Sequence, residues 1–499
     1  MRPFSLGSAP TLADLESVAR GGRRLSFAPA AKARVSRARA VVERVAAGSE
    51  AVYGVNTGFG EFASKRIAPE KVRELQRNLV LSHACGMGEA LPDAEARGLV
   101  FLRANELARG HSGCRPALVT LLAELVNRGV TPVVPSRGSV GASGDLAPQA
   151  HAALLTLGAG RAFYRGRVLS GAKALTAARL KPLTLEAKEG LCLINGTQGM
   201  QSVGGLALLD ALRVCEAADV ACAMSLESIM GSDAPLDARI HALKPHAGQR
   251  RSAERLRRML AGSVIRESHR EGDERVQDPY SFRCAPQVHG AVHEALWGAK
   301  DVVEVEMRSV TDNPIVAGGK LLSGGNFHGQ PLALAFDRAA AALASLAGVC
   351  ERRVFQVVSG GGPGLPMFLA KDPGLQSGFM IVQYVAAALA SELKTLAHPA
   401  AADSIPTSAN KEDFVSMGMW GAIKLHKAVE AAAGVVAIEL LAAAQAVETH
   451  APLKPGRGTA EALRRVRAVA RRSDGDEPLS DKMEALRGAV LAGEFGGIV

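Results

Sequence analysis

Aromatic side chains are scarce in this chain, and its cysteines follow no familiar pattern. Only 4% of the 499 residues are aromatic. The seven cysteines are scattered through apolar stretches without a CxxC pair. This arrangement disfavours both a disulfide framework and a zinc site, because each needs cysteines at short, regular spacings. We therefore expect free thiols in a cytoplasmic protein with no bound metal.

Membrane and targeting signals are also missing from the sequence. No run of about 18 uncharged apolar residues occurs, so no transmembrane helix is predicted. The N-terminal segment MRPFSLGSAPTLADLESVAR becomes polar and charged too early for a signal peptide. Neither an internal repeat nor a low-complexity linker is visible, which argues against a string of loosely joined modules.

Positive charge is in excess, with a formal net charge of +10, but its distribution does not indicate a nucleic-acid partner. The densest basic runs, residues 249–260 and 461–472, also hold acidic residues and carry an apolar stripe at helical spacing. Such segments are typical of the solvated faces of amphipathic helices. No nucleic-acid recognition motif accompanies them. The attraction of small anionic substrates stays open.

Alanine and leucine dominate the composition, which favours helix over strand. We predict a mainly α fold with a smaller, mixed N-terminal domain at residues 1–110 and a long central helix bundle within residues 111–499. The proline-rich segment 131–139 is expected to be extended without forming a central strand. Four segments of the second half are long and helically periodic, and some of them are apolar on more than one face, as in a bundle core that other subunits help to cover. These predicted helices span residues 290–307, 331–355, 380–396 and 421–448.

Several motifs that resemble catalytic signatures do not match them fully. Ser143 lies in GASGD, which lacks the last glycine of the G-x-S-x-G nucleophile turn. The glycine-rich loop at residues 52–62 does not match G-x-G-x-x-G, and no glycine-rich run ends in Gly-Lys-Ser/Thr. His289 and His293 lie four residues apart but lack the HExxH order of a zinc site. We expect these two histidines to be packed or surface residues.

The stretch GSVGASGDLAP (138–148) concentrates small residues directly before Asp145. With so little bulk, the backbone can fold so that the amide nitrogen of Gly144 approaches the carbonyl carbon of Ala142. Ring closure with loss of water, followed by loss of the Ser143 hydroxyl as a second water, would give an imidazolone with an exocyclic methylidene. An amide nitrogen is a poor nucleophile, so this chemistry needs a compressed backbone. Asp145 is the candidate for assisting the proton transfers.

Six blocks of the sequence together resemble the aromatic amino acid ammonia-lyases, over essentially the whole chain. In that family an Ala-Ser-Gly tripeptide forms the 4-methylidene-imidazol-5-one prosthetic group, and Ala142, Ser143 and Gly144 match it here. The resemblance implies a fumarase/aspartase-like fold, no metal and no diffusible cofactor, and a homotetramer whose active sites are shared between subunits. The blocks, in the family's order, are YGVNTGFG (53–60), GSVGASGDLAP (138–148), NGTQ (195–198), QDPYSFRC (277–284), DNP (312–314) and SGGNFHG (323–329).

The resemblance also assigns roles to single residues. The prosthetic group acts as an electrophile for the substrate amine and so activates the C–N bond for loss of ammonia. Tyr53 is implied as the base that removes the β-proton. Arg283 is implied to pair with the substrate carboxylate through a planar, two-point contact. The further implied site residues are Asn195 beside the carboxylate or the prosthetic group, Gln277 and the catalytic Tyr280 in the same site, and Phe327 in the wall around the substrate ring.

Two polar positions favour histidine as the substrate. His83, with Ser82 before it, occupies the ring-recognition position, where phenylalanine-type members resemble Phe-Leu and tyrosine-type members resemble His-Leu. A polar pair suits an imidazole, which donates and accepts hydrogen bonds. Glu412 matches the acid that histidine-type members place near the imidazole and the β-carbon. The block around it departs from the family pattern, since Gln-Glu-Asp-His is replaced by Lys-Glu-Asp-Phe, with Lys411 and Phe414 as the differences.

The expected reaction is the non-oxidative conversion of L-histidine to trans-urocanate and ammonia, a step of histidine degradation. The enzymatic alternative is a tyrosine ammonia-lyase or a tyrosine 2,3-aminomutase, which use the same prosthetic group. A helical scaffold without catalytic activity is the alternative from another class. The intact tripeptide, together with Tyr53 and Arg283, argues against such a scaffold.

Overall fold

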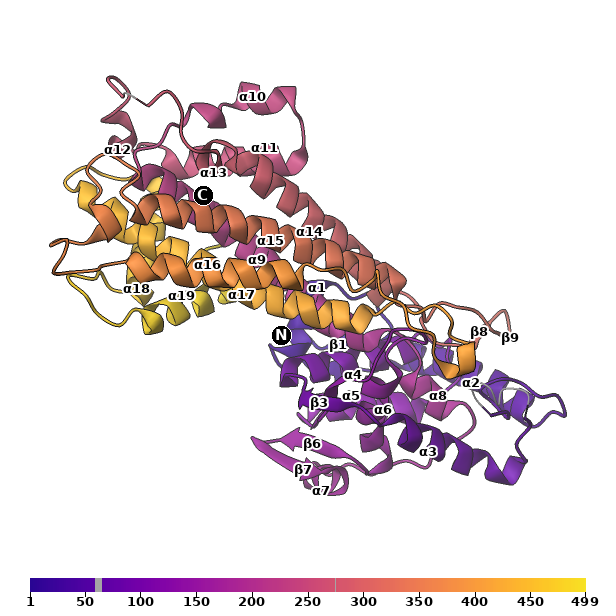
Figure 1. The fold of residues 1–499 in the computed structure, drawn as a ribbon. Helices are drawn as coiled ribbons and strands as arrows, with labels where there is room; N and C mark the ends of the chain where they lie inside the picture. Colours follow the sequence, from indigo (N-terminus) through magenta and orange to yellow (C-terminus); the bar gives the residue numbers. More distant parts are fainter. Residues whose placement is uncertain (59–64, 274) are drawn as a thin grey trace. The chain divides into compact units, whose positions relative to one another are not determined.

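The structure, a computed structural model, describes residues 1–58, 65–273 and 275–499, and most of them lie in helices (Figure 1). The chain forms two compact units, each assembled from three separate stretches. Unit 1 comprises Met1–Leu206, Lys300–Phe336 and Pro399–Ile423, and unit 2 comprises Ala207–Ala299, Asp337–His398 and Lys424–Val499. These units are defined by contacts, and the division of the sequence at residue 110 stays a prediction.

Unit 1 combines short helices with small sheets. Helix α4 is almost completely buried and contacts both α1 and α5. Helix α1 begins at Thr11, whose side chain forms a capping box with Asp14 and so satisfies the first free amide groups of the helix. The helices that lie wholly in unit 1 are α1 (Leu12–Ala19), α2 (Pro29–Ala46), α3 (Val72–His83), α4 (Asp93–Leu107), α5 (Pro116–Asn127), α6 (Leu146–Ala153), α7 (Gly171–Ala177) and α8 (Glu189–Ile194).

The strands in the described residues of unit 1 are short and pair in four small sheets. β6 and β7 form an antiparallel hairpin, and β4 pairs with the other edge of β6. The proline-rich segment contributes β4 and β5, so the prediction of an extended segment is confirmed. The strands are β1 (Phe4–Ser5), β2 (Leu25–Ser26), β3 (Met87–Ala90), β4 (Thr131–Pro132), β5 (Pro135–Arg137), β6 (Arg161–Tyr164), β7 (Arg167–Ser170), β8 (Ile315–Ala317) and β9 (Lys320–Leu322).

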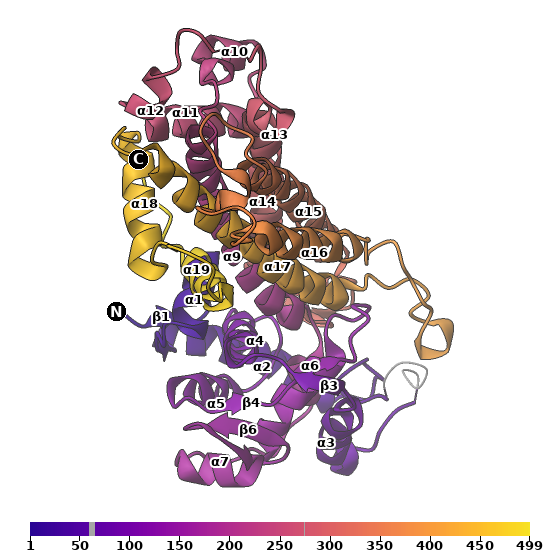
Figure 2. The ribbon, with the colours of Figure 1, turned by 60° about the vertical axis from the view of Figure 1, so that its left-hand side comes forward.

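Unit 2 is helical, and its long helices lie side by side (Figures 1 and 2). The four long helices predicted from the sequence are confirmed as α14 to α17. Three of these, together with α9, also contribute residues to unit 1. The helices are α9 (Gln198–Ser228), α10 (Ala238–Leu243), α11 (Ala247–Leu260), α12 (Val264–Glu267), α13 (Tyr280–Arg283), α14 (Ala285–Met307), α15 (Gln330–Val358), α16 (Met380–Leu396), α17 (Gly418–Val447), α18 (Arg457–Val469) and α19 (Ser480–Ala492).

Among the residues that the structure describes, two helices are long and apolar enough to cross a membrane by length and composition alone. They are the helical segments Gln330–Val358 and Gly418–His450. Of their most apolar stretches, 56% and 94% respectively are buried inside the protein. The second value is that of a core helix, as the sequence predicted for a segment that is apolar on several faces.

The basic runs and the cysteines also behave as predicted. The basic runs fall in α11 and α18, two amphipathic helices that pack against each other through their apolar sides. All seven cysteines are free thiols.

His289 and His293 are buried in unit 2, where they share one carboxylate. Asp219 accepts hydrogen bonds from Nδ1 of His289 (2.8 Å) and Nε2 of His293 (3.0 Å). The prediction that these histidines are packed is thus confirmed. Over the three described ranges, no group of three or more His, Cys, Asp or Glu side chains is arranged to hold a metal ion.

Candidate functional site

The tripeptide at residues 142–144 lies in a tightly compressed turn between β5 and α6. Gly141 and Gly144 both have positive φ angles, of 72° and 73°. A Cβ atom on Gly144 would lie only 2.0 Å from the carbonyl oxygen of Gly196. Ala142 is buried, whereas Ser143 is half-buried. Only glycine fits at position 144, so the residues present suit backbone cyclisation at this turn.

Asp145 follows the turn and is completely buried. Its carboxylate accepts hydrogen bonds from Ser139 Oγ (2.8 Å) and from the backbone nitrogen of Met200 (2.7 Å), in the first turn of α9. Burial raises the pKa of Asp145 to about 6, although the hydrogen bonds act in the opposite direction. The carboxyl group therefore titrates close to neutral pH, where it is suited to proton transfer.

Ser143, Glu412 and His83 come together in unit 1, although they are far apart in the sequence. Ser143 Oγ donates a hydrogen bond to Glu412 Oε1 (3.0 Å). Partial burial lowers the pKa of His83, while its hydrogen bond to the Leu79 carbonyl and the negative charge of Glu412 oppose this effect. Nδ1 of His83 lies 2.9 Å from that carbonyl oxygen. Because a carbonyl only accepts, Nδ1 carries the proton and Nε2 of the neutral ring is left as an acceptor.

The segment before Glu412 holds its carboxylate in place and adopts an unusual backbone. Thr407 donates from Oγ1 to Glu412 Oε2 (2.7 Å), and the two residues also pair through their backbones. Ser408, Ala409 and Asn410 all have φ angles between 50° and 66°. Such left-handed conformations are costly for residues other than glycine and persist where the surroundings impose them, often at functional sites.

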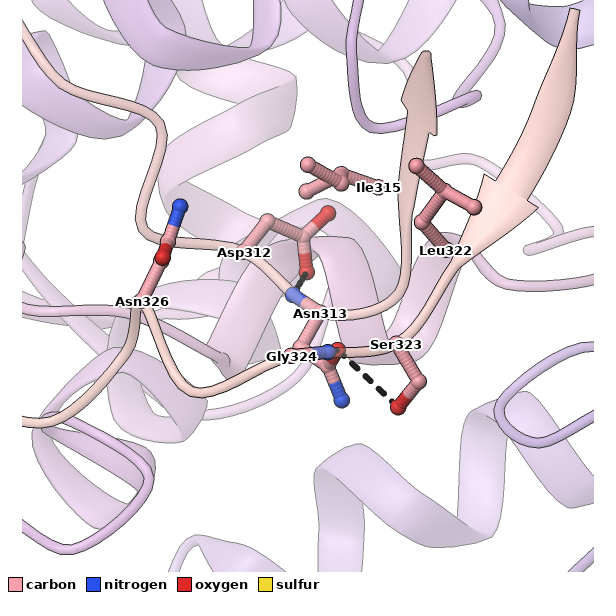
Figure 3. A pocket seen from close by; sticks show the side chains of 7 residues that line it. All are labelled: Asp312, Asn313, Ile315, Leu322, Ser323, Gly324 and Asn326. Carbon is pink, nitrogen blue, oxygen red and sulfur yellow. Dashed lines mark hydrogen bonds between the residues drawn. The ribbon is translucent and has the colours of Figure 1, made fainter.

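Asn195 stands at the end of α8 and bonds to Asn313, which lines a small cavity. Its Nδ2 donates to the carbonyl oxygen of Asn313 (3.3 Å), while Oδ1 is buried and has no hydrogen-bond partner within the described part of the chain. The cavity, of about 70 Å³, is shown in Figure 3, with Ser323 bonded to Oδ1 of Asn313. Its lining residues are Asp312, Asn313, Ile315, Leu322, Ser323, Gly324 and Asn326. Asn313 of the DNP block thus bonds to Asn195 through its carbonyl and to Ser323, the first residue of the SGGNFHG block, through its side chain.

Tyr53 and Phe327 are half-buried in the same unit. A Cβ atom on Gly54 would lie 2.6 Å from Leu191 and 3.2 Å from Pro314, so the Tyr53 turn rests against α8 and the DNP block. Two residues after Phe327, the backbone nitrogen of Gly329 donates to the Gly141 carbonyl (3.2 Å). The last two residues of the first block, at positions 59 and 60, lie outside the described residues.

Gln277, Tyr280 and Arg283 belong to unit 2, unlike the other predicted site residues. All three are exposed, and Tyr280 retains 71% of its accessible surface. Phe282 between them is buried and anchors the short helix α13. The predicted contact of Arg283 with a substrate carboxylate stays a prediction.

Several polar residues of the site were not predicted from the sequence. Thr407 orients Glu412, and Ser139 binds Asp145. Gln149 and Arg103 bind the Asn195–Gly196 segment. The only sequence signals are the turn-forming run around Thr407 and the position of Ser139 inside the small-residue stretch, and neither identifies a partner.

The comparisons with known proteins agree over nearly the whole chain. A sequence model described as "Aromatic amino acid lyase" matches residues 11–468. The histidine ammonia-lyase of Myxococcus xanthus is 49% identical over 98% of this chain and 96% of its own length. That of Stigmatella aurantiaca is 50% identical over the same shares.

Solved structures of this family have the same fold. The histidine ammonia-lyase of Trypanosoma cruzi has a TM-score of 0.92 and 37% identity, covering 100% of this chain and 95% of its own. The tyrosine aminomutase of Streptomyces globisporus has a TM-score of 0.93 and 35% identity, covering 99% and 97%. The predicted mainly helical, fumarase-like fold is thereby confirmed. The chain belongs to the aromatic amino acid lyase family.

Proposed function

We propose that this chain converts L-histidine to trans-urocanate and ammonia, as the names of its histidine ammonia-lyase relatives suggest. The observation that carries the proposal is the hydrogen bond between Glu412 and Ser143. His83 lies close enough to Glu412 for the carboxylate charge to act on the pKa of its imidazole. An acid and an imidazole beside the tripeptide are what recognition of a second imidazole requires.

A methylidene-imidazolone formed from Ala142, Ser143 and Gly144 would supply the electrophile that activates the substrate amine for departure. The compressed turn and the glycine at position 144 support this assignment. The buried Asp145 holds the chain directly after the tripeptide through its bonds to Ser139 and α9.

The substrate ring is recognised by two acceptors. Nε2 of His83 accepts a hydrogen bond, because Nδ1 is committed to the Leu79 carbonyl. Glu412 offers a carboxylate whose second oxygen is already bound by Thr407. An imidazole N–H can donate to one of these half-buried groups, whereas a benzene ring has no donor to offer them. A site that hydrogen-bonds its substrate discriminates against an analogue that lacks the hydrogen-bonding group.

Tyr53 removes the β-proton as a phenolate, which is the role its block implies. The packing of its turn against α8 and Pro314 supports this role, because Asn195 lies at the end of the same helix. Asn195 Oδ1 lacks a partner in the described chain and is available to a substrate amine or to the prosthetic group.

The active unit is a homotetramer in which Gln277, Tyr280 and Arg283 of one subunit complete the site of another. Two observations support this arrangement. These three polar side chains are exposed on unit 2. Apolar residues of α15 and α16 are also exposed, and burial of such residues stabilises an interface. They are Phe355, Ile381, Tyr384 and Val385. The seven free thiols support a cytoplasmic location.

The deciding experiment incubates the purified chain with L-histidine and, separately, with L-tyrosine. Urocanate should form from histidine, while tyrosine should give neither coumarate nor β-tyrosine. Equal turnover of tyrosine would reject the roles of His83 and Glu412, and β-tyrosine would identify an aminomutase. A Ser143→Ala variant should keep its tetramer and its full sequence mass but lose activity. Retention of full activity by this variant would exclude Ser143 as the precursor.

A further inference from the structure

The Ala142–Gly144 turn is held from one side by a single peptide segment, Asn195–Gly196. The backbone nitrogen of Gly196 donates to the Ser143 carbonyl (3.2 Å), and its carbonyl accepts from the nitrogen of Asp145 (2.8 Å). Gly196 therefore grips the chain on both sides of Gly144. The same carbonyl presses on Gly144 closely enough to exclude any side chain there.

Two buried side chains fix that segment in turn. Gln149 donates from Nε2 to the carbonyl oxygen of Gly196 (2.6 Å), and Arg103 donates to the carbonyl oxygen of Asn195 (2.6 Å). Arg103 also donates from Nε to Oε1 of Gln149 (2.7 Å). Only 2% of Arg103 and 1% of Gln149 is exposed. Because a guanidinium only donates, Arg103 orients the carboxamide with its oxygen inward and its nitrogen toward Gly196.

Arg103 is itself held by the neighbouring polar network. It donates to Oε1 of Gln198 and lies 3.6 Å from the carboxylate of Glu106. A Cβ atom on Gly196 would lie 2.7 Å from the Arg103 guanidinium and 2.5 Å from Thr311. Arg103 and Thr311 thus also pack against Gly196, and they prevent the 195–196 segment from moving away from the turn.

We propose that Arg103 and Gln149 are positioning residues for the maturation of the prosthetic group. They hold Gly196 against the turn and so keep the nitrogen of Gly144 near the carbonyl carbon of Ala142. This inference rests on the proposed function only in requiring that the group forms. In the absence of the two side chains, the segment can relax and the turn can open.

The covalent steps that the Gly196 contact promotes conserve all atoms and electrons and need no oxidant. The nitrogen of Gly144 bonds to the carbonyl carbon of Ala142, and its proton passes to the carbonyl oxygen. The resulting hydroxyl leaves as water with the amide proton of Ser143, which forms the C=N bond. The Ser143 hydroxyl then leaves as a second water with the Cα proton of the same residue. The mature chain is therefore two waters lighter than its sequence mass.

The test follows this mass change with time after cell-free synthesis. Gln149→Met keeps the length of the side chain but removes the donor to Gly196. Gln149→Glu keeps an acceptor for Arg103 but places an oxygen against the Gly196 carbonyl. Both variants should lose the two waters at least about tenfold more slowly than the parent chain. A tenfold change in rate corresponds to the net free energy of about one hydrogen bond.

Asn105→Leu is the matched control. Asn105 is a buried polar residue on the same helix as Arg103, and its side chain bonds to Gly7 and Ser8 instead of the 195–196 segment. This variant should mature at the parent rate, with helix content checked by circular dichroism. If Gln149→Met does not fold, Gln149→Glu and Arg103→Lys decide the question.

Three outcomes are distinguishable. Slow maturation of folded Gln149 or Arg103 variants, with Asn105→Leu unaffected, supports the proposal. Parent-like maturation of these variants, or an equal delay in the control, overturns it. A parent chain that keeps its full sequence mass refutes the prosthetic group itself and so the proposed function.

Discussion

Replacing Lys188 with methionine should destabilise unit 1 strongly, although Lys188 is not one of the predicted substrate-binding residues. Nζ of Lys188 lies 2.8 Å from Oδ2 of Asp312, and both side chains are completely buried. Burial favours the neutral amine, but the charge of Asp312, the neighbouring Cys192 and the hydrogen bonds to both together raise the pKa of Lys188. Lys188→Met leaves the Asp312 charge buried and unpaired, which costs about 3–5 kcal/mol for comparable pairs.

This pair also supports the candidate site. Oδ1 of Asp312 accepts from the nitrogen of Asn313 (2.7 Å), whose carbonyl in turn accepts from Asn195. Oδ1 of Asn313 accepts from the nitrogen of Gly324 (2.8 Å), which lies beside it in Figure 3. The DNP block therefore contacts both the NGTQ block and the SGGNFHG block. Lys188→Met should therefore lower kcat as well as stability.

The two tryptophans provide the assay, since one lies in each unit. A Trp297→Phe background leaves Trp420 as the reporter of unit 1. Urea unfolding is then measured for Lys188→Met, Asp312→Asn and the double variant. The double variant should lose at least about 2 kcal/mol less than the sum of the singles, because it buries no lone charge. Additive losses, or a loss below about 1 kcal/mol for Lys188→Met, would refute this account.

Three further outcomes are expected. Glu412→Gln should lower kcat/KM for L-histidine by about 10- to 100-fold in a urocanate assay, since a charge-assisted hydrogen bond is lost; an unchanged value would remove this residue from recognition. Gly144→Ala should keep its full sequence mass, because its Cβ would meet the Gly196 carbonyl at 2.0 Å; a chain two waters lighter would contradict the compression argument. Burial lowers the pKa of His293, but Cys215 and Asp219 raise it to about 10. The free energy of unfolding that the charged imidazolium contributes is therefore complete below about pH 6.5, the unfolded pKa, and is lost as the pH rises to 10. His293→Gln should therefore lower the free energy of unfolding more at pH 6 than at pH 10, with Trp297 as the reporter, and equal losses at both values would exclude a charged His293.

The long helices could be predicted because their signal is local. The alanine-rich segments repeat apolar residues at helical spacing, and their ends in the structure lie within five residues of the predicted ones. The composition of the two units could not be predicted in this way. Unit 1 takes residues from three distant stretches, and no local pattern records which stretches pack together. The tripeptide turn lay within reach of sequence analysis because cyclisation needs small residues next to one another.

The polar network behind the turn left no signal in the sequence. Arg103 and Gln149 are separated by 46 residues, and each resembles an ordinary surface residue when the sequence is considered alone. Their importance follows from burial, which makes every donor and acceptor need a partner. Burial of a polar residue is decided by the tertiary fold, so this layer of the site becomes visible only in three dimensions.

Phe414 replaces the histidine that the family pattern has two residues after Glu412, and the structure shows that this difference leaves the contacts of Glu412 intact. The Phe414 ring stacks on His328 at 6.1 Å between centroids, and its carbonyl oxygen lies 3.1 Å from Nε2 of the same histidine. Glu412 is held separately, by the side chain and the backbone of Thr407. The side chain at position 414 is therefore engaged with the SGGNFHG block, and the orientation of the Glu412 carboxylate does not depend on it. Recognition of the imidazole should then follow Glu412 and His83, and a Phe414→His variant should keep the preference for histidine over tyrosine.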